Sequence, residues 1–76
     1  MSPALADLPL RKVVDALTRA GFVHVHVRAK GSHAVYQHPN GRVAVVPQHS
    51  TVKRGTLASI LRQAGLTTAE FLQRLR

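Results

Sequence analysis

The sequence contains no cysteine and no tryptophan, and its 76 residues include only one tyrosine, two phenylalanines and three acidic residues. The absence of cysteine excludes a disulfide framework and a zinc site built on thiolates. With so few aromatic rings, the core has to be built from valine, leucine, isoleucine and alanine. No apolar run approaches the roughly 18 residues that a membrane-spanning helix needs. The start of the chain also lacks the basic segment and apolar stretch of a signal peptide, so we expect a cytoplasmic protein.

The scarcity of acidic residues leaves a large excess of positive charge. Eleven lysines and arginines give a formal net charge of +8 and an isoelectric point near 11.8. Such a domain favours a polyanionic partner, because neutralising phosphates releases condensed counterions. Nucleic acid is therefore the leading class of partner. An anionic membrane surface and an acidic protein are the competing classes.

The chain begins with a helical pattern. Leu10, Val13, Val14 and Leu17 recur at the spacing of an amphipathic helix. Pro9 suits the first helical turn, because the N–H that proline lacks is unpaired there in any case. A glycine follows at position 21, where a left-handed cap commonly ends a helix. We predict a helix over about residues 9–20.

The hydrophobic period then changes from 3.6 to 2 residues. Three valines, at positions 23, 25 and 27, alternate with two histidines and Arg28, which predicts a strand with one buried face. A short turn around Lys30 and an Asn40-Gly41 pair, a strong hairpin signal, divide the next residues into two further strands. We predict an antiparallel meander with strands over about residues 22–29, 32–38 and 42–47.

Helical spacing returns after a polar loop that runs from Gln48 to Arg54. Leucine, isoleucine and alanine side chains predict a helix over about residues 55–64. Thr67 followed by Glu70 forms a capping-box pattern that begins a short last helix over about residues 68–75. A three-stranded sheet and two amphipathic helices each have one apolar face. We therefore predict a single domain, residues 1–76, with an α+β two-layer sandwich whose helices cover one face of the sheet.

Five histidines stand out in so short a chain, because histidine exchanges protons near neutral pH. His24 and His26 lie two apart on one predicted strand and would share a face, as half of a metal site does. The chain has no cysteine and almost no carboxylates to complete the coordination, so we expect no metal and no other cofactor. His38 precedes a proline in the hairpin and is expected only to solvate the turn.

His33 has a different setting, because it follows the cationic, glycine-containing turn Lys30-Gly31-Ser32. A glycine lets the backbone approach a phosphate closely, lysine supplies charge, and serine supplies a hydroxyl and an N–H. The pattern indicates an acid or base beside a phosphate site, although an ordinary surface histidine beside a hairpin turn fits the spacing equally well. A second candidate phosphate site precedes the helix at 55–64, where an N-terminus attracts anions. Its residues are His49, Lys53 and Arg54.

Five segments of the chain form a pattern through their order and spacing rather than through one motif. They are Lys30-Gly31-Ser32-His33, Tyr36-Gln37-His38-Pro39-Asn40-Gly41, Val45-Val46-Pro47-Gln48-His49, Gly55-Thr56-Leu57 and Ile60-Leu61-Arg62-Gln63-Ala64-Gly65-Leu66. Together they resemble the HicA family of toxin mRNA interferases, and the resemblance runs from the first predicted helix almost to the C-terminus. It implies a fold like the double-stranded RNA-binding domain, α-β-β-β-α, here with a short extra C-terminal helix.

The resemblance also implies a function, the toxin of a type II toxin–antitoxin system. Such a toxin cleaves mRNA without a metal and is neutralised by a HicB-type antitoxin that is usually encoded alongside it. The family's catalytic histidine lies in a Gly-Ser-His segment, which assigns the role of general acid or base to His33. Many members carry a second histidine directly after it, where this chain has Ala34. If the chemistry belonged to that second position, this chain would be an attenuated or an inactivated variant.

We expect binding of RNA to be led by phosphate contacts and to fall steeply with salt, and we expect a monomer when the chain is alone. The residues expected to bind RNA phosphates are Arg28, Lys30, Gly31, Ser32, His49, Lys53 and Arg54. The alternatives are a non-catalytic RNA-binding module of the same fold and a structural protein whose basic surface meets an acidic partner. A DNA-binding role is less favoured, because no helix carries a recognition-helix signature.

Overall fold

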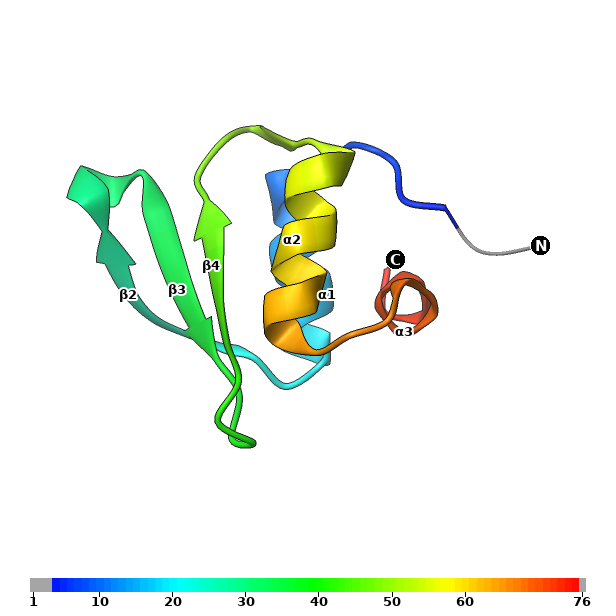
Figure 1. The fold of residues 1–76 in the computed structure, drawn as a ribbon. Helices are drawn as coiled ribbons and strands as arrows, with labels where there is room; N and C mark the ends of the chain where they lie inside the picture. Colours follow the sequence, from blue (N-terminus) through cyan, green and yellow to red (C-terminus); the bar gives the residue numbers. More distant parts are fainter. Residues whose placement is uncertain (1–3, 76) are drawn as a thin grey trace.

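A computed structural model describes residues 4–75 and confirms the predicted α+β architecture. A three-stranded antiparallel sheet of order β2-β3-β4 forms one layer, and the helices cover one of its faces (Figure 1). The succession α1, β2, β3, β4, α2 is the α-β-β-β-α order of the double-stranded RNA-binding fold, followed by the short α3. The bounds are α1 Leu10–Arg19, β2 Val23–Arg28, β3 His33–Gln37, β4 Val43–Pro47, α2 Arg54–Ala64 and α3 Thr68–Gln73.

The first helix starts one residue later than the sequence pattern predicts. Pro9 precedes the helix with ψ 143, an extended value, and belongs to a two-residue strand, β1 Leu8–Pro9. This strand pairs antiparallel with β5 Thr51–Val52, which lies inside the segment predicted to be only a polar loop. The small β1–β5 sheet was missed because two-residue strands carry no periodic signal. At its other end α1 closes as expected, since Gly21 has a φ of 98.

The second strand differs from the alternation that its valines suggest. Its register against β3 shifts between His24 and His26, so that Val25 is an extra residue, a β-bulge. The bulge reverses the alternation, which places Val23 and Val27 on opposite faces of the sheet. All six residues of β2 are exposed. The prediction of one buried face for this strand was therefore wrong, and β2 is an exposed edge strand.

The two hairpin connections differ in shape. Residues Ala29–Gly31 form a turn of 3-10 helix in which Lys30 has the left-handed φ of 56. The second connection contains the predicted Asn40-Gly41 pair, and only Gly41 has a positive φ, of 93. The side-chain oxygen of Asn40 accepts a hydrogen bond from the backbone N–H of Arg42 at 2.8 Å. The turn is thus stabilised by the asparagine side chain and by the conformational freedom of glycine.

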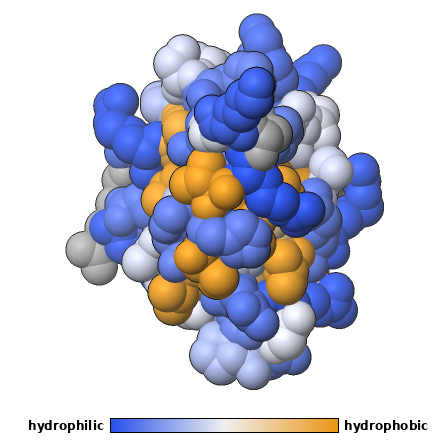
Figure 2. Space-filling view, turned by 90° about the vertical axis from the view of Figure 1, so that its left-hand side faces the viewer, coloured by the Kyte–Doolittle hydropathy of each residue, from blue (hydrophilic) through white to orange (hydrophobic). Residues whose placement is uncertain are grey.

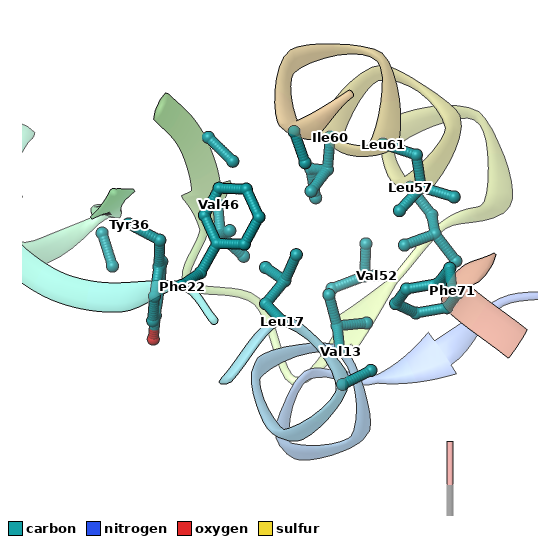
Figure 3. Packing of buried hydrophobic residues seen from close by; sticks show 14 residues of the cluster. Val13, Leu17, Phe22, Tyr36, Val46, Val52, Leu57, Ile60, Leu61 and Phe71 are labelled. Carbon is teal, nitrogen blue, oxygen red and sulfur yellow. The ribbon is translucent and has the colours of Figure 1, made fainter. Parts of the chain in front are cut away.

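The core lies between the sheet and the helices (Figure 3). β3 contributes Ala34 and Tyr36 to it, because alternate residues of a strand point to the same face. Burial raises the pKa of the Tyr36 phenol above its ordinary value of 10.0, so this side chain stays protonated. The core is aliphatic apart from three rings, as the composition requires. Its members are Val13, Ala16, Leu17, Phe22, Ala34, Tyr36, Ala44, Val46, Val52, Leu57, Ile60, Leu61, Ala64 and Phe71.

The two C-terminal helices begin and end on local signals. The left-handed Gly65 ends α2, and Thr67 and Glu70 form both hydrogen bonds of the predicted capping box at the start of α3. These hydrogen bonds from Thr67 lower the pKa of Glu70 below its ordinary value of 4.5. α3 ends at Gln73, two residues before the predicted end. It packs against α1 and α2 on the side away from the sheet (Figure 1).

Candidate active site at one end of the sheet

The face of the sheet that the helices leave uncovered, here called the open face, carries three rows of side chains across the strands. Because cross-strand partners share a face, the register defines these rows. His33 lies on this face, since its neighbour Ala34 points into the core. The rows are Arg28–His33–Pro47 at the end near the β2–β3 turn, His26–Val35–Val45 in the middle, and Val23–Gln37–Val43 at the end near the β3–β4 turn.

His33 is held by the residue that precedes it. The Ser32 hydroxyl oxygen lies 3.1 Å from Nδ1 of His33. The carbonyl of Ser32 accepts a hydrogen bond of 2.8 Å from the backbone N–H of Gln48, which follows β4. The serine is thereby fixed between the two strands, and it orients an imidazole that is only half-buried. Nε2 is the ring nitrogen left for proton exchange with a ligand.

The turn beside His33 is cationic. Arg28 lies directly across from His33 in the register of β2 and β3. Lys30 is exposed, and Gly31 has a φ of 91, with nothing within 4 Å of the place where a Cβ would stand. An anion therefore meets no side chain at Gly31. The structure gathers four of the predicted site residues around the histidine, and these are Arg28, Lys30, Gly31 and Ser32.

A pocket of about 220 Å³ adjoins this end of the sheet. Pro47, the partner of His33 in β4, forms one wall, whereas His33 itself does not line the pocket. His49 and Lys53 also line it, which brings two further predicted residues to the same region. The remaining lining residues are Thr51, Val52 and Thr56. An imidazole and an ammonium group on the wall suit an anionic ligand.

The N-terminus of α2 is not open to a phosphate in the way that the sequence suggested. The backbone N–H of Arg54 donates to the carboxylate of Asp7 at 2.7 Å, and the other carboxylate oxygen lies 3.8 Å from Nζ of Lys53. An acidic side chain thus occupies the position expected for an anion. Sequence analysis missed Asp7, because no local pattern links it to a helix 47 positions away. Arg54 does not line the pocket beside His33.

Two other histidines have settings that differ from those predicted. The bulge places His26 opposite Val35 on the open face, whereas His24 lies against the ring of Tyr36 on the helix side, with 5.3 Å between centroids. They do not share a face, so the half-site for a metal that their spacing suggested does not form. Across residues 4–75, no three potential metal-ligating side chains of histidine or carboxylate type come together.

His38 is a structural residue rather than a solvated turn residue. Its Nδ1 accepts a hydrogen bond from the backbone N–H of Asn40 at 3.0 Å, so Nε2 carries the proton and donates to the carbonyl of Ala20 at 3.1 Å. Its ring also meets Phe22 edge-on, with centroids 5.1 Å apart. The expectation of turn solvation alone was wrong, because the ring joins the β3–β4 turn to the end of α1.

Comparison with known proteins gives one family. The family model described as HicA toxin of bacterial toxin–antitoxin matches residues 10–66 of the 76-residue chain. The matched range runs from the start of α1 to just beyond α2 and includes every element of the candidate site. A search of curated proteins found no match. Within residues 4–75, every helix is too short or too polar to cross a membrane.

Proposed function

Since the chain belongs to the family of HicA toxins of bacterial toxin–antitoxin systems, we propose that it is an endoribonuclease that cleaves mRNA with His33 as general acid or base. The observation that carries this proposal is the row Arg28–His33–Pro47 on the open face. The proposal is supported by an imidazole that lies across from a guanidinium group in this row and within 3.1 Å of the Ser32 hydroxyl, and by Pro47 of the same row, which lines the pocket of His49 and Lys53.

The proposed reaction is attack of a ribose 2′-oxygen on the adjacent phosphorus. The P–O5′ bond breaks as the new P–O2′ bond forms, the 2′-hydroxyl loses its proton, and the leaving 5′-oxygen gains one. When Ser32 accepts from Nδ1–H of His33, Nε2 is unprotonated and takes the proton of the hydroxyl. When the ring is protonated on both nitrogens, Nδ1–H still donates to the Ser32 hydroxyl oxygen, and Nε2–H gives its proton to the leaving oxygen. Ser32 therefore serves as the positioning residue in either role.

Cations at the same end of the sheet would stabilise the charge that develops on phosphorus. Arg28 stands across from His33, and Lys30 lies in the adjoining turn. A guanidinium group pairs with two phosphate oxygens at once, whereas an ammonium group acts as a compact point charge. We assign transition-state stabilisation to Arg28 and substrate binding to Lys30, His49 and Lys53. The proposed mechanism is metal-independent, because side chains supply the acid or base and the cations.

The alanine at position 34 is compatible with an active enzyme. Its side chain is 2% exposed and belongs to the core between the sheet and the helices. A histidine in this position would point away from the open face, because neighbouring strand residues face opposite ways. The departure at Ala34 thus leaves the chemistry at His33 unaffected.

The test is incubation of the purified chain with a long RNA in EDTA, beside His33→Ala and a matched His26→Ala variant from the next row of the same face. We expect cleavage by the parent and by His26→Ala, and a loss of about 10²-fold or more in His33→Ala. Equal cleavage by the parent and His33→Ala would refute the assignment. Intact RNA in every sample, with binding that weakens as salt rises, would identify a non-catalytic RNA-binding module.

A further inference from the structure

The pocket beside Pro47 differs in character from the cationic turn of the candidate active site. Pro47 and Val52 give it apolar walls, and His49 adds an imidazole ring. Thr51 and Thr56, whose hydroxyl groups both donate and accept hydrogen bonds, complete the lining together with one lysine. A cavity with apolar walls and a few polar side chains is typical of a site for a small organic group, because the polar atoms fix the orientation of the ligand.

The positive charge of the pocket is partly neutralised. Lys53 brings an ammonium group, but its Nζ lies 3.8 Å from one carboxylate oxygen of Asp7. The other oxygen accepts a hydrogen bond of 2.7 Å from the backbone at the start of α2. The turn with Arg28 and Lys30 lies instead in a stretch, residues 23–47, that contains no acidic residue. A phosphate is therefore better placed at the turn, and the pocket suits an uncharged part of the same substrate.

The size and the lining of the pocket fit one nucleobase. Its volume of about 220 Å³ lies below the roughly 300–1,000 Å³ of sites for drug-sized ligands, so it holds a single ring system rather than a whole nucleotide. The bases are the uncharged, planar parts of RNA, and they stack on aromatic side chains, histidine included. Among the described residues that line the pocket, His49 carries the only aromatic ring.

The open face of the sheet is less suited to a base. Figure 2 views the molecule from the side of the sheet and shows hydrophobic residues gathered among hydrophilic ones. The exposed hydrophobic residues of the strands include Val23, Val25 and Val43. Valine has neither a ring for stacking nor a hydrogen-bonding group in its side chain. His26 does place a ring on this face, but the side chains of its row partners, Val35 and Val45, offer the edge of a base no hydrogen bond.

Backbone contacts place the pocket close to the candidate catalytic histidine. Pro47 is the direct partner of His33, and opposite residues of antiparallel strands have Cα atoms about 4.5–5.5 Å apart. The next residue, Gln48, donates its N–H to the Ser32 carbonyl at 2.8 Å. This bond ties the loop that carries His49 to the residue that orients the catalytic imidazole. Because one ribose joins a base to its phosphate, a single nucleotide can reach both the pocket and the imidazole.

We propose that the pocket is a nucleobase subsite, in which a base beside the scissile phosphate stacks on the His49 ring and hydrogen-bonds to the hydroxyls of Thr51 and Thr56. This inference rests on the proposed ribonuclease function and deepens it. Phosphate contacts position RNA without reading its sequence, whereas contacts to a base specify it. The turn beside His33 accordingly holds the phosphate, and the pocket decides which bases lie next to the cut.

The first experiment measures binding without cleavage. The isotope-labelled chain is titrated in an NMR experiment with adenosine or uridine, which carry no phosphate, and separately with inorganic phosphate. We expect the nucleosides to shift the amide signals of residues 48–56, and phosphate to shift those of residues 28–33. His49→Ala should weaken nucleoside binding about tenfold, and His49→Phe, which keeps a stacking ring, should restore it to within about threefold of the parent. The control His26→Ala removes the same ring outside the pocket and should bind nucleosides like the parent.

Mapping of the cut sites tests the subsite in the active enzyme. His49→Ala should cut a long RNA with an altered base preference beside the cut, whereas His33→Ala should fail to cut at any site. A parent that cleaves no RNA but binds nucleosides at residues 48–56 would refute the enzyme and leave the subsite standing. The proposal would be overturned by nucleosides that shift no signal in the pocket, by phosphate that shifts the pocket signals instead, or by nucleoside binding and base preference that are unchanged in His49→Ala.

Discussion

The residue after the candidate catalytic histidine separates two interpretations of the chain. If the chemistry belonged to position 34, restoring a histidine there would activate the protein. In the structure, Ala34 pairs with Val27 on one side and with Val46 on the other, and it is 2% exposed on the helix side of the sheet. We therefore expect Ala34→His to destabilise the fold and to give no gain in cleavage.

The size of this effect follows from the site. Forcing a larger side chain into a packed core costs about 1–3 kcal/mol, and burying an imidazole without hydrogen-bond partners adds about 1–3 kcal/mol. The expected loss is about 2–6 kcal/mol. At about 0.05–0.15 kcal/mol per residue, the 76 residues are stable by only about 4–11 kcal/mol in total. A loss of 3 kcal/mol would lower Tm by about 12–24 °C in a domain of this size.

The assay is thermal and urea unfolding together with RNA cleavage. Val27→His is the matched control, because it puts the same imidazole on the same row of the helix side, at a position that is 50% exposed. We expect this control to unfold close to the parent. If Ala34→His were as stable as the parent and cleaved RNA faster, position 34 would be accessible to substrate. The assignment of the chemistry to His33 would then be wrong.

Three further predictions concern the supports of the fold and the site. Gly21→Ala should lower the free energy of unfolding by about 2–4 kcal/mol in urea titrations, because the φ of Gly21 is 98 and a Cβ there would stand 2.8 Å from Nε2 of His38. The control Gly41→Ala, which has open space around its Cβ, should cost less. An equal loss in both variants would contradict the structural role of the His38 ring. Since the pKa of Glu70 is lowered in the folded chain, its contribution is present above the ordinary value of 4.5 and is lost as pH falls through the lowered pKa of the folded state. The Tm difference between the parent and Glu70→Gln should therefore be seen at neutral pH and shrink as the solution is made acid below 4.5, and a difference that stayed constant in acid would refute this. Asp7→Ala should destabilise the fold by about 1 kcal/mol, because the N-terminus of α2 loses the carboxylate that accepts its hydrogen bond. The same variant should bind RNA more tightly at low salt in filter-binding assays. An unchanged affinity would show that the N-terminus of α2 binds no phosphate.

The helices and the order of the three strands were predictable from the spacing of hydrophobic residues and from the residues that cap helices and form turns. The spacing of Leu10, Val13 and Leu17 requires a helix whose apolar stripe faces a core, and Thr67 with Glu70 marks the start of α3 within the sequence itself. Contacts between distant segments were not predictable in this way. The β1–β5 pair and the cap from Asp7 depend on where the N-terminal segment lies against α2, and no local pattern encodes that position.

The bulge at Val25 is the clearest feature that the sequence pattern did not predict. It matters because it determines which side chains of β2 lie on the open face. With strict alternation, His24, His26 and Arg28 would share the helix side of the sheet. The extra residue shifts the register between His24 and His26, which moves Arg28 to the face of His33. It also removes Val27 from the face of Val23. One inserted residue thus places Arg28 across from the candidate catalytic histidine, which strict alternation would have prevented.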